Sequence, residues 1–204
     1  MTVSTLLAAS GVFAALAFTG TAAARSLVRG AQPFEDGPPP GRPNVAAIVA
    51  AGALLGAGAA ARSAGLPELG LCAVLTLVLA GVCYADMRCG LVPDVFTLAP
   101  LAAVLAGDAL LHQWSALAAV LIVAGPFALA ARLSKGRGMG WGDVKLVALG
   151  AAVLGAEPAL LGFVAACFAA VAVAAVRGRR STAIAFAPYL ACAIAVGVAV
   201  RGVA

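Results

Sequence analysis

Charged residues are scarce in this sequence. Lys, Arg, Asp and Glu together make up 10% of the 204 residues, whereas soluble domains carry about 25%. Mean hydropathy is +1.09, and apolar runs of about 20 residues, which are typical of transmembrane helices, recur along the chain. A soluble chain of this length could not bury so many apolar side chains. The composition therefore disfavours a water-soluble fold and predicts an all-α, polytopic membrane protein whose spans form a single domain, residues 1–204.

Closely paired cysteines are missing as well. The sequence contains no Cys-x-x-Cys motif, and most of its five cysteines fall inside apolar runs. Zinc sites and disulfide frameworks depend on regularly spaced cysteines, so the sequence predicts neither. We interpret the cysteines as small apolar side chains within helices. They are Cys72, Cys83, Cys89, Cys167 and Cys192.

A basic arm of the kind that binds nucleic acid is also absent. The net charge is +5, but the basic residues are spread over short loops without interleaved aromatic residues. Lys and Arg in such loops indicate membrane topology. We therefore expect the lipid bilayer, and no nucleic acid, as a partner.

Eight apolar segments follow one another along the chain. They are predicted as spans at about 3–24, 45–62, 69–86, 95–111, 115–133, 143–156, 159–176 and 182–200. The longest polar stretch, residues 25–44, is rich in proline and glycine in its second half and predicts a loop.

The loops between eight spans alternate between the two sides of the membrane. Eleven of the 13 basic residues then fall on one side, and Arg62 and Arg201 fall on the other. The positive-inside rule assigns the first side to the cytoplasm. Both termini are therefore expected outside, and residues 25–44 form a cytoplasmic loop.

Two acidic residues, Asp86 and Asp143, each abut an apolar segment on the predicted cytoplasmic side. Ionisable side chains at such positions are costly and are functional candidates. Two carboxylates brought close in a partly dry site cannot both ionise comfortably, so one keeps a proton. Such a pair can activate water and protonate a leaving amine. Peptide hydrolysis would then need no metal, no other cofactor and no covalent nucleophile.

Glycines precede Asp143, at Gly138, Gly140 and Gly142. Glycine allows a substrate strand to approach the backbone closely, and the first turn of a helix favours a negative charge. The alternative interpretation is that the acidic residues only cap helix ends. Asp94 is predicted to be such a cap.

The residues around both acids form a recognisable pattern. Asp86 is followed by Leu91-Val92-Pro93-Asp94, and Asp143 lies in Gly140-Trp141-Gly142-Asp143-Val144-Lys145. This resembles the prepilin peptidases, also called type IV leader peptidases, which are membrane aspartic proteases with a Gly-x-Gly-Asp motif. Residues 185–190 also resemble a Pro-Phe-Gly-Pro-like segment of that family. The resemblance covers a catalytic core of about residues 68–200.

The resemblance implies an aspartic endopeptidase with Asp86 and Asp143 as catalytic residues. It implies supporting roles, at the motif or at the substrate, for Gly140, Gly142, Lys145, Pro93 and Asp94. The implied substrate is a prepilin or pilin-like precursor, whose short basic leader is cut ahead of the hydrophobic pilin helix at the cytoplasmic face of the inner (plasma) membrane. The apolar flank of the scissile bond is then the start of that helix. The activity belongs to type IV pilus assembly and protein secretion.

The sequence departs from the larger bacterial members of that family. Those carry a sizeable cytoplasmic region, often with Cys-x-x-Cys pairs, that is linked to N-methylation of the new pilin terminus. Residues 25–44 stand in its place and contain no cysteine, so we expect no N-methyltransferase activity. The compact form is similar to the short peptidases that accompany tight-adherence pili. Ala187 occupies the position of a usual glycine.

Two other functions stay open from the residues alone. The first is a small proton-coupled transporter that uses the same acids as a relay. A relay is expected near the middle of the bilayer, whereas Asp86 and Asp143 are predicted at span ends. The second is a non-catalytic subunit of a pilus or secretion assembly.

Overall fold

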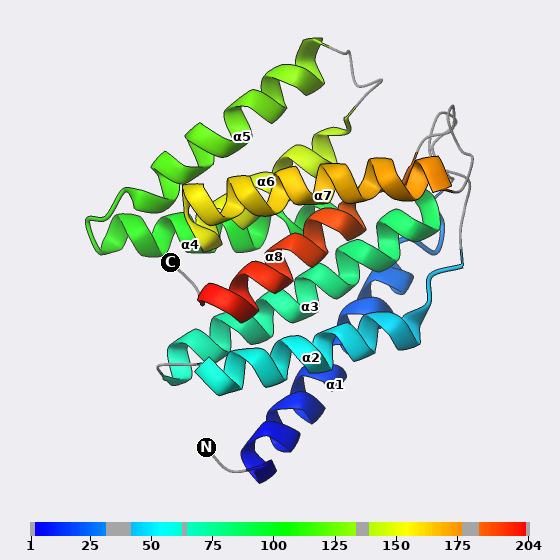
Figure 1. Cartoon of the computed structure of the whole chain (residues 1–204), viewed down its shortest axis with the longest axis vertical. Coiled ribbons are helices and arrows are strands. Elements are labelled where there is room, and N and C mark those ends of the chain that lie inside the picture. The colour runs from blue at the N-terminus through cyan, green and yellow to red at the C-terminus, as the bar shows by residue number, and fades with distance from the viewer. Residues whose placement is uncertain (1–2, 32–41, 63–64, 134–138, 177–183, 203–204) are drawn as a thin grey trace.

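The computed structural model describes residues 3–31, 42–62, 65–133, 139–176 and 184–202. In these residues the chain forms eight α-helices and one 3-10 helix, η1, without a strand (Figure 1). The prediction of an all-α chain is confirmed. The elements are α1 (Val3–Leu27), α2 (Val45–Arg62), α3 (Leu66–Cys89), η1 (Asp94–Phe96), α4 (Leu98–Leu110), α5 (Ser115–Leu133), α6 (Trp141–Leu154), α7 (Ala156–Val176) and α8 (Ala187–Arg201).

Among these helices, α1, α2, α3, α5 and α7 are long and apolar enough to cross a membrane. The other three, α4, α6 and α8, have 13, 14 and 15 residues. A 14-residue helix is about 21 Å long, which is shorter than the ~30 Å hydrocarbon core of a bilayer. The structure therefore supports five spans by length and composition, and the expected total of about eight stays a prediction.

Several predicted boundaries are wrong by a few residues. The loop expected at 25–44 begins later, because residues 25–29 contain no glycine or proline and α1 continues to Leu27. Pro67 and Pro158 stand just before the predicted starts of their spans, at 69 and 159, but lie in the first turns of α3 and α7. Proline is tolerated there because the first N–H groups of a helix have no partner within it. Gly138 lies outside the described residues.

The helices form two groups joined by α8. The first group is α1, α2 and α3, which contact one another, and the second is α4 to α7. The joining helix α8 contacts α2 and α3 on one side and α6 and α7 on the other (Figure 1). Small residues allow the close approach within the first group. A Cβ at Gly20 of α1, for example, would collide with the backbone carbonyl of Leu77 in α3.

Helix α6 is the most enclosed element, because α4, α5, α7 and α8 all contact it. Ten of its 14 residues are buried. A Cβ at Gly150 would come within 2.6 Å of Phe163 in α7 and within 2.7 Å of Ile194 in α8. This packing fixes the position of the first turn of α6, which carries Asp143.

Successive helices run in alternating directions, so the bundle has two distinct ends (Figure 1). The start of α1 and the end of α8 lie at one end. The end of α3 and the starts of α6 and α8 lie at the other. The second end, called the dyad end below, holds both Asp86 and Asp143.

Candidate active site

Asp86 lies in the last turn of α3, and its exposed fraction is 6%. Gly90 ends this helix in the left-handed conformation, with φ 68°, and its N–H donates to the backbone carbonyl of Asp86 at 2.8 Å. Glycine adopts this conformation without the steric cost of a Cβ. The helix thus stops one turn after the carboxylate, and the chain turns toward the Leu91-Val92-Pro93-Asp94 segment.

The carboxylate of Asp86 accepts a hydrogen bond from a distant part of the chain. The backbone N–H of Ala187, the first residue of α8, donates to Oδ2 at 3.1 Å. Ala187 is fully buried. The first N–H groups of a helix have no partner within the helix and favour a negative charge. The start of α8 therefore orients Asp86 and offers it a fixed donor.

Asp143 is the third residue of α6, in the first turn, as predicted. The helix begins at its N-cap, Gly140, whose backbone is extended. The backbone N–H of Gly140 donates to the Asp143 side chain, which is the return hydrogen bond of a capping box. Asp143 is half-buried, so this carboxylate is the more accessible of the two.

Two contacts attach the first turn of α6 to the segment that follows α3. A Cβ at Gly142 would come within 2.8 Å of the Val92 Cβ, so only glycine allows this approach. Lys145 Nζ lies 2.6 Å from Asp94 Oδ1 in an ion pair. Pro93 keeps the segment extended, with φ −64° and ψ 133°, between these two contacts.

The prediction that Asp94 caps a helix is wrong. Its own 3-10 helix has Pro93 at the N-cap and no side-chain cap hydrogen bond. The carboxylate instead takes the charge-assisted hydrogen bond from Lys145, which is stronger than a bond to a neutral donor. Lys145 therefore links two segments that are 51 positions apart in the sequence.

The structure brings Asp86 and Asp143 to the same end of the bundle, close enough to interact electrostatically. Gly140, Gly142, Lys145, Pro93 and Asp94 surround the same end. Two carboxyl groups within electrostatic reach of each other, one buried and one more accessible, can favour different protonation states and so serve as general acid and general base. The sequence missed the Ala187 donor, because a backbone N–H has no side-chain signature. The one available signal was the family-like segment at 185–190.

The acids of the opposite end have structural partners. Asp108 Oδ2 accepts the backbone N–H of Ala116 at 2.8 Å and the hydroxyl of Ser115 at 3.3 Å, and so caps α5. Glu157 lies 3.9 Å from Arg201. Within the described residues, no three His, Cys, Asp or Glu side chains gather into a group that could hold a metal.

Comparison with known proteins agrees with the sequence pattern. The model of the type IV leader peptidase family matches residues 73–175, which include Asp86, Pro93, Asp94 and the whole Gly-x-Gly-Asp motif. No curated protein and no solved structure gives a significant match. The family match covers just over half of the chain and confirms the resemblance.

Proposed function

Since the chain belongs to the type IV leader peptidase family, we propose that it is an aspartic-type endopeptidase with Asp86 and Asp143 as its catalytic pair. Its substrates are prepilins or pilin-like precursors, from which it removes the leader. The observation that carries this proposal is the meeting of two carboxylates from α3 and α6 at one end of the bundle. Both lie inside the segment that matches the family.

The pair supplies both halves of an acid–base hydrolysis. The ionised carboxylate takes a proton from water as the water oxygen attacks the scissile carbonyl carbon. The protonated carboxyl donates a hydrogen bond to the carbonyl oxygen, which becomes negative in the tetrahedral intermediate. A proton then passes to the amide nitrogen, the C–N bond breaks, and the new amine leaves. The shared proton belongs to the pair rather than to either residue.

Each carboxylate is held by a backbone donor, so neither relies on a mobile side chain for its position. Ala187 fixes Asp86, and Gly140 fixes Asp143. Rigid positioning of reacting groups supplies a large share of enzymatic rate enhancement. The Asp94–Lys145 ion pair and the Gly142–Val92 contact fix the distance between the two halves of the site.

We place the dyad end at the cytoplasmic face of the inner membrane. Eleven of the 13 basic residues belong to the loops and helix ends assigned to this side, and segments rich in Lys and Arg stay cytoplasmic. The absence of cysteine from residues 25–44 supports a peptidase without N-methyltransferase activity. The mature pilin would then leave the enzyme with an unmethylated N-terminus, which mass spectrometry of the product can establish.

The test is a leader-cleavage assay with isosteric variants of each acid. Asp86→Asn and Asp143→Asn should each reduce cleavage of a co-expressed prepilin by at least about a hundredfold, because each removes one partner of the acid–base pair. Asp108→Asn at the opposite end is the matched control and should cleave normally. Membrane insertion of all three is checked by fractionation.

Normal processing by either dyad variant would refute the catalytic assignment. A wild-type protein that inserts correctly but cleaves no pilin-like precursor would instead favour a non-catalytic subunit.

A further inference from the structure

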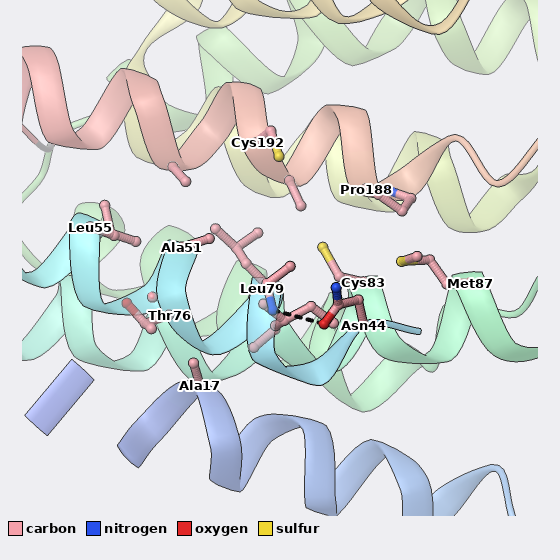
Figure 2. A pocket seen from close by; sticks show the side chains of 16 residues that line it. Ala17, Asn44, Ala51, Leu55, Thr76, Leu79, Cys83, Met87, Pro188 and Cys192 are labelled. Carbon is pink, nitrogen blue, oxygen red and sulfur yellow. Dashed lines mark hydrogen bonds between the residues drawn. The ribbon is translucent and has the colours of Figure 1, made fainter. Parts of the chain in front are cut away.

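An apolar groove lies beside Asp86 in the first group of helices. Its volume is about 240 Å³, and residues of α1, α2, α3 and α8, together with Asn44, line it. Figure 2 shows Cys192 of α8 and Cys83 of α3 pointing into it from opposite sides. No step of the proposed hydrolysis uses this groove.

The groove runs parallel to the helices and begins at the dyad end. On α3 its lining extends from Met87 to Thr76, a distance of about 16 Å along the helix. On α2 it extends from Ala47 to Leu55, with Asn44 just before that helix. It is therefore an elongated depression that leads from the end of the bundle toward its middle.

At the dyad end, the residues that line the groove include neighbours of Asp86 and of its hydrogen-bond donor. Met87 follows Asp86 in the chain, and Pro188 follows Ala187, whose N–H binds the Asp86 carboxylate. Cys83 lies one helical turn before Asp86 on α3. Two separate elements thus connect the groove to the same carboxylate.

The lining restricts what the groove can hold. None of its lining residues, all of which the structure describes, is charged. The amide oxygen of Asn44 is already occupied, since it accepts the backbone N–H of Ala47 at 3.1 Å. An anionic lipid headgroup is recognised by Lys and Arg, and the groove offers neither. It offers an apolar surface to apolar side chains.

We propose that this groove binds the apolar part of the substrate that flanks the scissile bond; this inference rests on the proposed function. The peptide would lie across Asp86 and Asp143, and its apolar flank would continue along α3 and α8 toward the middle of the bundle. The polar flank would leave toward the loops of the dyad end. The groove is smaller than the ~300–1,000 Å³ of pockets that enclose whole small molecules. It therefore accepts side chains from one face of the segment, and their size becomes a determinant of specificity.

The first test fills the groove without touching the catalytic pair. Ala51 of α2 lines the groove and is exposed, whereas the neighbouring Ala50 is also exposed and does not line it. Two purified precursors are compared that differ by Ala or Phe at one position of the apolar flank. Ala51→Phe should raise KM for the Phe precursor at least about tenfold and leave kcat within about threefold, because it removes binding rather than chemistry. The Ala precursor should be affected less, and Ala50→Phe should resemble the wild type with both.

The second test locates the substrate directly. In the Asp143→Asn background, which keeps the precursor uncleaved, single cysteines in the apolar flank are joined to the enzyme with a bifunctional maleimide. Cross-linking should depend on Cys83 and Cys192, which both line the groove, and should be lost in the Cys83→Ser/Cys192→Ser double variant. Cys167→Ser on α7 is the control, because Cys167 does not line the groove, and it should leave the cross-link intact.

The outcomes separate this inference from the proposed function. Cleavage by the Asp86→Asn or Asp143→Asn variants would overturn the catalytic assignment itself. If those variants are inactive but Ala51→Phe cleaves both precursors as the wild type does, the groove is a lipid or packing feature and the inference is wrong. A cross-link that persists when Cys83 and Cys192 are both replaced by serine would overturn it as well.

Discussion

At the scale of single residues, the candidate site depends on backbone groups as much as on the two acids. Asp86 is oriented by the N–H of Ala187 and Asp143 by the N–H of Gly140. Gly142 contributes only the absence of a side chain, which lets α6 approach Val92. Substitutions that add no atoms and leave the backbone donor in place should therefore be tolerated. Substitutions that add atoms should displace the donor or the helix that carries it, and should not be tolerated.

Ala187 offers the first prediction. Ala187→Gly keeps the N–H that binds Asp86, so its cleavage rate should stay within about threefold of the wild type. Ala187→Val adds two methyl groups at a fully buried position, where overpacking costs roughly 1–3 kcal/mol, and should lower cleavage at least about tenfold. Leader cleavage and the thermal midpoint of unfolding in detergent are measured for both. Equal loss in the two variants would contradict a role for the backbone group.

Gly142 offers the second prediction. A methyl group there would lie 2.8 Å from the Val92 Cβ, so Gly142→Ala must displace α6 from the segment after α3. We expect at least about a tenfold loss of kcat with a smaller change in KM, because the displaced group belongs to the reacting pair. Gly125→Ala in α5 meets no atom within 4 Å and serves as the control. Full activity of Gly142→Ala would show that the close approach is dispensable.

At the scale of elements, the Asp94–Lys145 pair connects the segment after α3 to α6. Both side chains are partly exposed, 60% for Asp94 and 30% for Lys145, and an exposed pair contributes only about 0–1 kcal/mol to stability. Its expected contribution is to position the first turn of α6, and hence Asp143, against α3.

A double-mutant cycle tests this link. Asp94→Asn and Lys145→Met should each lower kcat about three- to tenfold while the thermal midpoint changes little. The double variant should lose little more than either single variant, because the two residues act through one contact. Additive losses would mean that the two side chains act independently, for instance by binding the substrate separately.

The sequence predicted the elements well where one principle dominates. Apolar runs predicted all eight helices, since length and hydropathy decide them, and the motifs singled out Asp86 and Asp143. The sequence did not reveal that Asp94 pairs with Lys145 instead of capping a helix. An aspartate suits a local helix cap and a distant ion pair equally well, so its identity does not distinguish the two. Ala187 was missed as a donor, and the apolar groove could not be predicted, because both arise only when α8 packs against α3.

At the scale of the whole molecule, α8 joins the two groups of helices and touches both functional features. Its first residue binds Asp86, and Pro188, Ala191, Cys192 and Ala195 line the groove. The position of α8 therefore couples Asp86 to the surface proposed for the apolar flank. The orientation of the whole bundle in the membrane then decides from which side a substrate can reach Asp86 and the groove.

The orientation yields the last prediction. Ser26, near the end of α1 at the dyad end, and Gln113, between α4 and α5 at the opposite end, are both exposed. In a variant whose native cysteines are replaced by alanine, Gln113→Cys in intact cells should react with a membrane-impermeant maleimide. Ser26→Cys should react only after the membrane is permeabilised, because the basic loops hold the dyad end in the cytoplasm. The reverse labelling pattern would place the catalytic pair outside, where a precursor still attached to its cytoplasmic leader could not reach it.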